Sequence, residues 1–374
     1  MIIPTYNRSA LLRETLNSVM AQSYRDFDVV VVDDGSSDDT RQVVAQFGKP
    51  VLYVHQGNRG RSSARNLGVQ ASSGKYLMFL DSDDMLLPSS LEALVSALEA
   101  DPTCGLAYSD GYYCDEIGTV LEAFSGCTQL RTQDLLETLA LRNVVITPAA
   151  ALVRRDSLNS LQYPYFDESL SAGEDQDLWL RLAAGGCNFK FVDTLTCKYR
   201  LHSRNGIQSQ STNVDQLLLS HYHYYGERYT QCRLKLFHSD TFLRLSSSTQ
   251  TTFLYCLLLH PIYGDPALHD TVLGSDRFND LPSNVKSQIL YLVAIDDLLH
   301  GKVVELVGDR LARAVALSPR CLKYRLGYWA ASIAPTALRV LIPALRRVRG
   351  LRISSSVPFH RIRSAVGQQA KGTV

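Results

Sequence analysis

The chain has 374 residues, of which 45% are hydrophobic and 20% charged, and its formal net charge is +1. This composition is ordinary for a globular protein and excludes a disordered or collagen-like chain. A chain of this length suffices for two or three domains, and it buries roughly 75% of its unfolded surface without needing disulfide or metal staples. The eight cysteines include no CxxC pair, so we expect reduced core thiols.

Charge is distributed unevenly along the chain. From Arg320 to Val374 there are eleven Lys or Arg residues and no Asp or Glu, which leaves 27 basic and 37 acidic residues, a net charge of −10, before that point. The opening residues are too few and too polar for a secretory signal, and no long uncharged apolar run follows. We therefore expect a cytoplasmic protein with a separate basic tail.

The first hundred residues alternate between short β-branched apolar runs and longer helical patterns. Strands are predicted near 2–3, 27–32, 51–55 and 76–80, and helices over 9–21, 38–47, 61–71 and 88–100. Alternation of this kind is typical of βαβ units, so the fold class is α/β, with a Rossmann-like, mostly parallel sheet and helices on both of its faces.

Beyond residue 100 the pattern becomes mixed, and from about residue 215 it is helical only. Further strands are predicted over 105–113, 149–153 and 189–199, and a helix over 175–184. We therefore expect an α/β domain over 1–210 with halves at about 1–100 and 101–210, a mainly helical extension over 211–319, and a basic amphipathic tail over 320–374.

A polar cluster follows each of the first four predicted strands. The clusters are Thr5-Tyr6-Asn7, Asp33-Asp34-Gly35-Ser36, Asn58-Arg59-Gly60-Arg61 and Asp81-Ser82-Asp83-Asp84. Ligands of open α/β sheets bind beyond the carboxyl ends of the strands. We therefore expect the clusters to converge in space.

Asp81 and Asp83 alternate at the end of a buried apolar strand, so their side chains point to the same side of an extended chain. Two carboxylates this close favour a cation, and Mg²⁺ or Mn²⁺ binds one or two carboxylates while waters and substrate phosphates complete its shell. Acidic residues are also common in turns and as helix N-caps. The position after a buried strand favours the metal site.

Asp34 lies at the carboxyl end of its predicted strand, where its carboxylate could accept a hydrogen bond from a base imide or a ribose hydroxyl. Arg61 and Arg65 are four residues apart at a helix start and share one face, which suits a diphosphate. A solvated helix surface is the alternative for both arginines, and this alternative is stronger for Arg61 than for Arg65.

Glu174 and Asp175 begin a predicted helix. Acidic residues at this position also complement the helix dipole.

Six motifs stand in one order along the chain: IIPTYNR, VVDDGSSDDT, NRGRSSARNLGV, FLDSDD, GEDQDLWLRL and KYRLH. Through them the chain resembles family 2 glycosyltransferases of the GT-A fold over roughly residues 1 to 210. The resemblance implies inverting, metal-dependent transfer of a sugar from a nucleotide-diphosphate donor, most commonly a UDP-sugar. It also implies a saccharide or lipid-linked acceptor, a role in surface polysaccharide or glycolipid synthesis, and no nucleic-acid partner.

The resemblance assigns roles on the donor side to residues of the first half. Pro4, Thr5 and Tyr6 would line the nucleotide pocket, Asp34 would meet the base, Arg65 would approach the diphosphate and Asp81 would bind the ribose side. Family members usually carry a few more strand residues before IIPTYN. The first strand is therefore expected to start short, and whether the N-terminus is complete stays open.

The resemblance also assigns the metal ligands and the base. Asp83 would bind Mg²⁺ or Mn²⁺, with Asp81 beside it and His202 as a further ligand; an ordinary loop histidine is the alternative for His202. Asp175 would be the general base, and Glu174 is the other acid of the pair. A single displacement inverts the anomeric carbon and requires no covalent nucleophile.

Two alternative functions, a nucleotidylyltransferase and a non-catalytic binding protein, would require different motifs. A sugar-1-phosphate nucleotidylyltransferase relies on a Gly-rich basic loop directly after the first strand, where this sequence has PTYNRSALL. A non-catalytic sugar-nucleotide-binding protein would have a broken DxD or lack an acid of the Glu-Asp pair. Both motifs are intact here, which favours the transferase.

The basic tail contains an uncharged apolar stretch, Leu326–Leu338, which is too short to span a membrane. Tyr324, Tyr328 and Trp329 stand beside arginines, which suits a membrane interface, where each basic side chain gains about 1 kcal/mol near anionic lipid. A helix packed on the acidic part of the protein is the alternative. The tail therefore predicts either peripheral attachment to the inner face of the cell membrane or packing on the chain itself.

Overall fold

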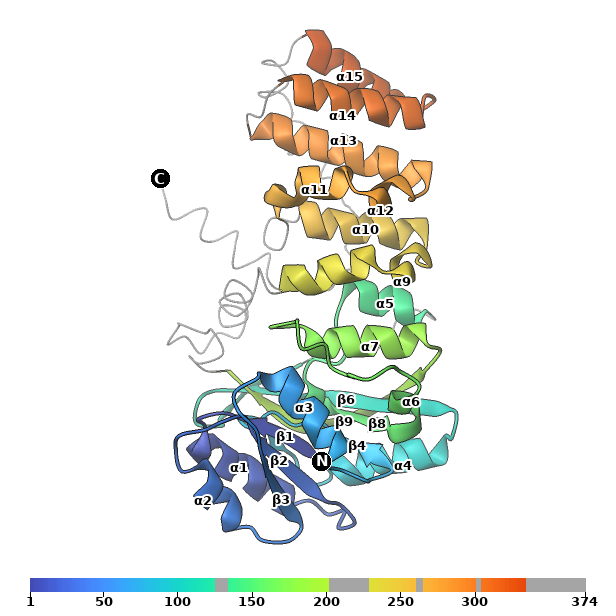
Figure 1. Ribbon diagram of the computed structural model, residues 1–374. Coiled ribbons are helices and arrows are strands. Elements are labelled where there is room, and N and C mark those ends of the chain that lie inside the picture. The colour runs from blue at the N-terminus through green and yellow to red at the C-terminus, as the bar shows by residue number, and fades with distance from the viewer. Residues whose placement is uncertain (125–133, 202–228, 260–264, 301–303, 334–374) are drawn as a thin grey trace. The chain divides into compact units, whose positions relative to one another are not determined.

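The computed structural model describes residues 1–124, 134–201, 229–259, 265–300 and 304–333. His202 and the tail beyond residue 333 lie outside these ranges, and so does the predicted domain boundary near residue 210. The chain divides into two compact units that meet in the sequence at Cys232 and Arg233. Figure 1 labels the elements of both units.

The first unit begins with a parallel sheet whose strands β1 (Ile2–Thr5), β2 (Val29–Asp33) and β3 (Val51–His55) lie in the order β1-β2-β3. Helices α1 (Ser9–Met20) and α2 (Thr40–Ala45) cover one face and α3 (Arg61–Gln70) covers the other (Figure 1). Val29 and Val31 of β2 join the same buried cluster as the α1 side chains, whereas Val30 and Val32 pack with Ala64 of α3. The unbroken apolar run of β2 therefore reflects burial on both faces.

The predicted strand 76–80 is shared between two sheets. Its first part, β4 (Tyr76–Leu77), pairs antiparallel with β8 (Ala151–Arg154) of a second sheet. Its last part runs beside β1, where the Ile2 N–H donates to the Met78 carbonyl (2.8 Å) and the Leu80 N–H donates to the Ile2 carbonyl (3.0 Å). This segment therefore delivers the Asp81–Asp84 loop to the carboxyl end of β1.

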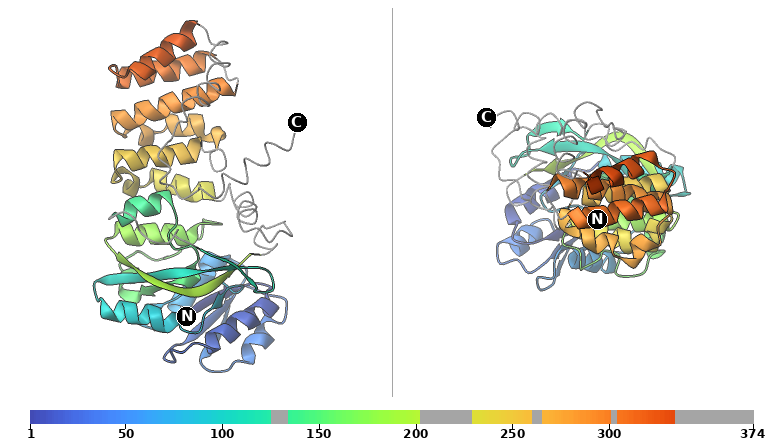
Figure 2. Two further views of the ribbon diagram at one scale, coloured as in Figure 1. Left: turned by 180° about the vertical axis from the view of Figure 1, so that it is seen from behind. Right: turned by 90° about the horizontal axis from the view of Figure 1, so that it is seen from above.

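The second sheet has the order β4-β8-β6-β9-β5, with β7 (Val120–Ala123) paired to β6. Its long strands β6 (Cys104–Cys114) and β9 (Asn188–Arg200) run parallel and side by side, as both views in Figure 2 show. Strands β5 (Met85–Leu86), β7 and β8 pair antiparallel with their neighbours. The mostly parallel arrangement is therefore confirmed for the first sheet, whereas the second sheet is mixed.

The predicted helices of the first unit lie within a few residues of their expected positions, including α4 (Ser90–Ala100) and α7 (Glu174–Ala184). Two short helices, α5 (Leu135–Leu141) and α6 (Arg155–Asn159), were not predicted. A short 3₁₀ turn, Pro148–Ala150, precedes β8. Pro88, predicted in the first turn of α4, lies before the helix instead, where its carbonyl accepts the Ser23 N–H at 2.8 Å.

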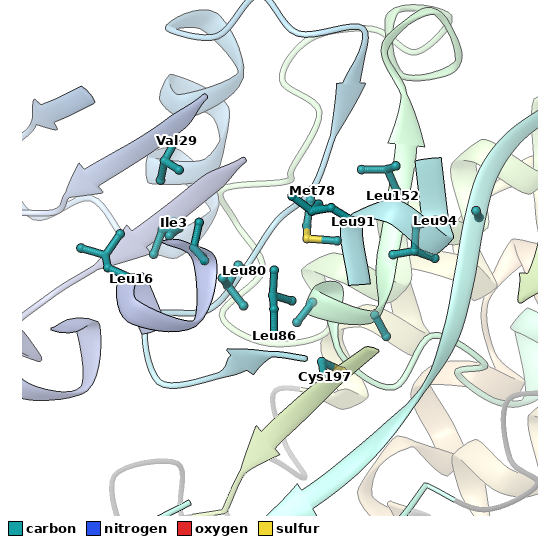
Figure 3. Packing of buried hydrophobic residues seen from close by; sticks show 14 of the residues in the cluster. Ile3, Leu16, Val29, Met78, Leu80, Leu86, Leu91, Leu94, Leu152 and Cys197 are labelled. Atoms are coloured by element: carbon teal, nitrogen blue, oxygen red, sulfur yellow. The ribbon is translucent and has the colours of Figure 1, made fainter. Parts of the chain in front are cut away.

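One hydrophobic core joins the two sheets (Figure 3). It contains Ile3, Leu16 and Val29 from the first sheet and its helix, Leu94, Leu152 and Cys197 from the second, and Met78 and Leu80 between them. Each fully buried aliphatic side chain contributes about 1.5–3 kcal/mol. The shared core holds the carboxyl ends of the strands in fixed positions. The cysteines of the described residues are free thiols. Cys104, Cys114, Cys197 and Cys232 are buried, as expected, whereas Cys187, Cys256 and Cys321 are half-buried.

The second unit is helical throughout its described residues, as predicted. Its helices are α9 (Asp240–Leu243), α10 (Ser247–Leu258), α11 (His269–Leu273), α12 (Asp276–Asn279), α13 (Ser283–Leu299), α14 (Val304–Leu317) and α15 (Leu322–Ile333), with a 3₁₀ turn at Pro266–Leu268. Helices α10, α13, α14 and α15 stack in that order (Figure 1). In the part of the chain that the structure describes, no helix is both long and apolar enough to cross a membrane.

Candidate active site

A pocket of about 330 Å³ lies beyond the carboxyl ends of the strands in the first unit. The four polar clusters meet there, as expected from the parallel sheet. Nine predicted site residues line the pocket: Pro4, Thr5, Tyr6, Asp34, Arg65, Asp81, Asp83, Glu174 and Asp175. His202 lies outside the described residues, so its predicted role stays a prediction.

Asp34 organises the loop that leads into α3. Its Oδ1 accepts hydrogen bonds from the Arg59 N–H (2.8 Å) and the Gln56 side chain (2.7 Å), and its Oδ2 accepts from the Gly60 N–H (2.9 Å). Gly60 has a φ of 90°, a region that favours glycine. The carboxylate therefore fixes one wall of the pocket.

Arg65 joins three separate elements at the floor of the pocket. Its side chain is 1% exposed, and it contacts Asp81 Oδ1 at 2.5 Å and Glu174 Oε1 at 2.6 Å. Burial opposes its charge, but the charges of Asp81 and Glu174 outweigh burial and raise the pKa of the Arg65 guanidinium. Arg65 is therefore a buried cation that ties α3 to the Asp81–Asp84 loop and to the start of α7.

The two acids of the predicted catalytic pair have different environments. Burial opposes ionisation of Glu174, but the charge of Arg65 lowers the pKa of that carboxyl. Asp175 is half-buried, and burial followed by the charge of Glu174 raises its pKa to about 7. A general base works best with a pKa near the operating pH. Arg65 therefore holds Glu174 as a carboxylate, whereas the pKa of Asp175 is raised toward neutrality.

The acidic loop after β4 is held by three arginines: Arg65, described above, Arg8 and Arg200. Arg8 Nη1 lies 2.5 Å from Asp83 Oδ2, and the two side chains are 26% and 8% exposed. Arg8 is the residue after Asn7 in the first polar cluster, and it lines the same pocket. A positive charge therefore already lies at the predicted metal ligand.

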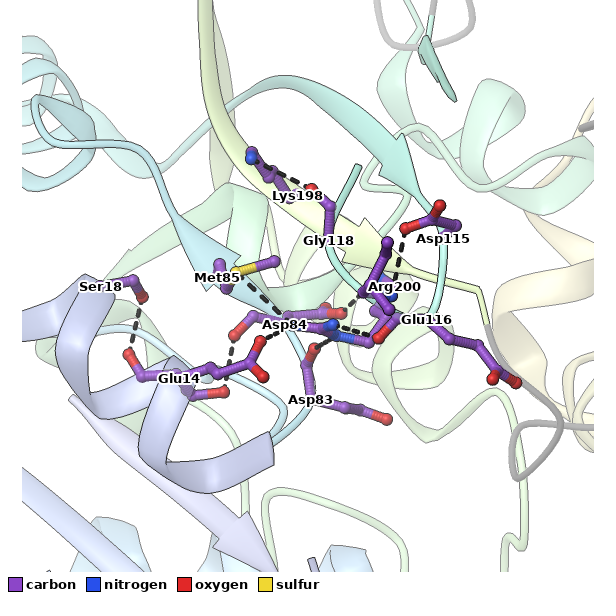
Figure 4. A network of polar contacts seen from close by, with 12 residues as sticks. Glu14, Ser18, Asp83, Asp84, Met85, Asp115, Glu116, Gly118, Lys198 and Arg200 are labelled. Carbon is purple, nitrogen blue, oxygen red and sulfur yellow. Dashed lines mark hydrogen bonds and ion pairs between the residues drawn. The ribbon is translucent and has the colours of Figure 1, made fainter. Parts of the chain in front are cut away.

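Arg200, at the end of β9, contacts the same loop (Figure 4). Its buried guanidinium donates to the Asp83 carbonyl (2.9 Å) and the Glu116 carbonyl (2.5 Å), and it pairs with Glu14 of α1 at 2.6 Å. A buried charge with several acceptors is costly to disturb, since removing a partner leaves an uncompensated group. The backbone of Asp83 is therefore fixed by β9.

Asp84 completes this support. It is buried, and its carboxylate accepts from the Arg200 N–H and the Thr147 hydroxyl, both at 3.0 Å. Burial, with the charges of Asp83 and Asp81, raises the pKa of Asp84 well above its ordinary value. The third acid of the DSDD sequence is therefore a structural anchor.

The donor set fits a divalent ion of the Mg²⁺ type. Among the described residues no group of three or more His, Cys, Asp or Glu side chains is arranged to hold a metal by itself. Mg²⁺ and Mn²⁺ do not need such a cage, because one or two carboxylates and the substrate phosphates complete their shell. Asp81 and Asp83 line the pocket, and the Arg8 guanidinium at Asp83 shows that this position accommodates a positive charge.

Several pocket residues were missed in the sequence. Arg8, Thr147, Tyr199 and Tyr229 line the pocket without having been assigned a role. Asn58 and Arg61 come from the third polar cluster and line it too, although a solvated helix surface was the favoured alternative for Arg61. Arg61 Nε lies 3.9 Å from Glu174 Oε1. The adjacency of Arg8 to the first polar cluster was an available signal. Tyr199 belongs to the KYRLH motif, which pointed only to His202, whereas Thr147 and Tyr229 lie in segments without a motif.

Comparison with known proteins gives consistent results. Residues 1–161 match the family model described as Glycosyl transferase family 2. An uncharacterized glycosyltransferase of Methanocaldococcus jannaschii is 27% identical over 228 residues, which cover 59% of this chain and 76% of that protein. The Escherichia coli enzyme WfaP, a UDP-Glc:α-D-GlcNAc-diphosphoundecaprenol β-1,3-glucosyltransferase, is 24% identical over 205 residues, which cover 54% of this chain and 77% of that protein. Some relatives are much longer, and the matched part of this chain spans only 26–30% of the glycosyltransferases of Rickettsia bellii, Rickettsia conorii and Rickettsia felis.

A solved structure supports the fold. S. aureus TarS 1–349 superposes with a TM-score of 0.51 and 17% sequence identity, covering 88% of this chain and 89% of that one. This similarity agrees with the GT-A fold expected from the sequence. It concerns the arrangement of the backbone, so the chemistry rests on the side chains of the pocket.

Proposed function

We propose that this chain, which belongs to glycosyl transferase family 2 through residues 1–161, is an inverting enzyme that depends on a divalent metal. It transfers a sugar from a nucleotide-diphosphate donor to an acceptor hydroxyl. One observation carries the proposal: Asp175, with a pKa raised to about 7, lines the same pocket as the acidic loop at Asp83. A base near neutrality and a site for the leaving diphosphate are the two parts that such a transfer requires.

The donor half of the pocket suits a nucleotide diphosphate. Pro4, Thr5, Tyr6 and Asp34 line the pocket; the first three would contact the nucleotide, and Asp34 would meet its base. Asp83 and Asp81 would hold Mg²⁺ or Mn²⁺, which supplies positive charge to the leaving diphosphate.

Arg65 and Arg61 have different proposed roles, one in positioning carboxylates and the other in binding the diphosphate. Arg65 was predicted to approach the diphosphate, but its charge is already matched by two carboxylates. We propose that Arg65 acts mainly by positioning Asp81 and Glu174. Arg61 is more exposed and begins α3, so the helix N-terminus adds to its charge. Arg61 is therefore the better candidate for contact with the diphosphate.

Asp175 supplies the proton acceptor in the transfer. It takes the proton of the acceptor hydroxyl while that oxygen forms a bond to the anomeric carbon. The bond between that carbon and the diphosphate oxygen breaks on the opposite side, and the electron pair leaves with the nucleoside diphosphate. One displacement inverts the carbon. Glu174, held by Arg65, positions the start of α7.

The relatives guide the choice of substrates. The E. coli relative takes UDP-Glc and an acceptor on diphosphoundecaprenol. We propose a UDP-sugar donor and a saccharide or lipid-linked acceptor for this chain, in surface polysaccharide or glycolipid synthesis.

A donor screen tests this function directly. The protein is heated with a panel of nucleotide sugars, with and without Mn²⁺, and the unfolding temperature is recorded. A ligand at 100 times its Kd stabilises the native state by about 2.7 kcal/mol. The stabilising donor is then incubated with the protein, and its products are analysed. Release of nucleoside diphosphate supports the transferase; release of pyrophosphate indicates a nucleotidylyltransferase, and binding without turnover indicates a non-catalytic protein.

We also propose a membrane surface as a partner, through α15. Leu322, Leu326 and Trp329 are 65%, 54% and 63% exposed, and their spacing places them on one helix face, opposite the buried Tyr324. Because the chain has only basic charges from Arg320 onward, an anionic bilayer complements this face. Full-length protein and the variant Leu326→Glu are sedimented with anionic and with neutral vesicles. Salt-sensitive binding to anionic vesicles that the variant loses supports the proposal, and equal sedimentation of both proteins refutes it.

A further inference from the structure

The predicted metal ligand Asp83 is already paired with a cation of the chain. Arg8 Nη1 donates a charge-assisted hydrogen bond to Asp83 Oδ2 at 2.5 Å. Both side chains are mostly buried, and both line the donor pocket. Partial burial reduces screening by solvent, so this pair contributes more than the exposed ion pairs of protein surfaces.

The turn that carries Arg8 has an unusual backbone. Asn7 has a φ of 50° and is the one non-glycine residue with positive φ among the described residues. Its N–H donates to Ser36 Oγ at 2.9 Å, and its Oδ1 accepts the Ser37 N–H at 2.8 Å. Strained conformations persist where the surroundings over-determine them, and they gather at functional sites. The loop after β2 therefore holds the turn from which Arg8 reaches Asp83.

We infer that Arg8 is a competing cation at the metal site. It holds Asp83 Oδ2 while no divalent ion is bound, and it must release this oxygen when an ion binds there. Metal binding is then an exchange of one cation for another, and its affinity is lowered by the strength of the Arg8–Asp83 pair. This inference rests on the proposed role of Asp83 as a metal ligand.

The exchange links metal binding to donor binding. Once released, the Arg8 guanidinium faces the pocket with an unmatched charge, and the diphosphate of the donor offers it a new anionic partner. The nucleotide therefore favours the metal-bound state more strongly when Arg8 is present. Because such coupling is reciprocal, the metal strengthens nucleotide binding by the same factor.

The variant Arg8→Gln tests the inference through metal binding alone. Mn²⁺ is titrated into the full chain without nucleotide, and free Mn²⁺ is followed by electron paramagnetic resonance. We expect the Kd for Mn²⁺ to fall about three- to tenfold, the range for a partly buried ion pair. The enhancement of Mn²⁺ affinity by UDP should shrink in the same variant.

Arg13→Gln is the matched control. Arg13 lies on α1, which begins directly after Arg8; it is exposed and bonds to Gln46, so its loss removes an equal charge without touching Asp83. Its Mn²⁺ affinity should equal that of the wild type. Equal or weaker Mn²⁺ binding by Arg8→Gln overturns the inference, because Arg8 would then support the ligand. If wild type and Asp83→Asn bind Mn²⁺ equally, the proposed metal site itself is wrong, and that result is distinct from the first.

Discussion

The variant Glu174→Gln tests which of the two acids at the start of α7 is the general base, because it should change the pH dependence of turnover. The pKa of Asp175 is about 7, raised by burial and then by the charge of Glu174. One pH unit below that value, about a tenth of the carboxyl is ionised, so turnover of the wild type should be about a tenth of its plateau. Gln removes the neighbouring negative charge and leaves the charge of Arg65 less compensated. Both effects lower the pKa of Asp175.

We expect the pKa of Asp175 to fall by about one unit or more in this variant. At about pH 6 at least half of the carboxyl would then be ionised, so turnover relative to the plateau rises about fivefold. Gln retains an oxygen that accepts the hydrogen bond from Arg65, but it leaves that buried charge with one carboxylate. The free energy of unfolding should therefore fall by about 3 kcal/mol.

The assay measures release of nucleoside diphosphate from the donor across about pH 5.5 to 8.5, the range in which Asp175 titrates. Glu168→Gln is the control, because Glu168 pairs with Arg59 and Asn66 and does not line the pocket. Its profile should match the wild type. Asp175→Asn should lose about 10²- to 10⁴-fold in turnover and keep donor binding. An unmoved acid limb in Glu174→Gln, or an active Asp175→Asn beside an inactive Glu174→Gln, would refute the assignment and make Glu174 the base.

Three further outcomes follow from the acidic loop. Asp83→Asn should abolish the Mn²⁺-dependent thermal shift with the donor, measured against the unliganded variant; a retained shift contradicts the metal assignment. Arg200→Lys should cost about 3 kcal/mol of stability in urea unfolding, because one ammonium cannot serve the acceptors of the guanidinium, and a neutral result refutes that account. Asp84→Asn should gain stability relative to wild type as pH rises above about 4, because the raised pKa of Asp84 makes the native state lose stability as its carboxyl is forced to ionise. A relative loss of stability at high pH would show that Asp84 is ionised in the fold.

The first sheet was predictable because each of its elements carries a local signal. The run Val29–Val32 is apolar at every position, and the structure buries both of its faces between α1 and α3. The convergence of Asp34 with Asp81 followed from parallel strands ending at one edge. The second sheet was less predictable, because strand direction depends on the connection and on the partner. Met85–Leu86 is too short for a recognisable pattern, yet it pairs with β9.

The division of roles among charged residues was not predictable from local sequence. Glu174 and Asp175 are neighbours and appear equivalent in the motif, but Arg65, 109 residues away from Glu174, distinguishes them. Arg200 ends a strand that has no visible link to the acidic loop, and it contacts Asp83 across 117 residues. Such pairs become apparent only when the strands are in register.

The contacts of Arg65 have a consequence for how activity emerges during folding. This side chain joins Asp81, 16 residues away, to Glu174, 109 residues away, so the proton-accepting group is positioned only after both halves of the first unit have docked. Closing so long a loop is slow compared with forming the local βαβ units. Upon dilution from denaturant, helical signal and nucleotide binding by the first sheet can therefore return before catalysis does. Refolding followed by turnover reports on the docking of the two halves, and two fragments split between the sheets should be active only when mixed.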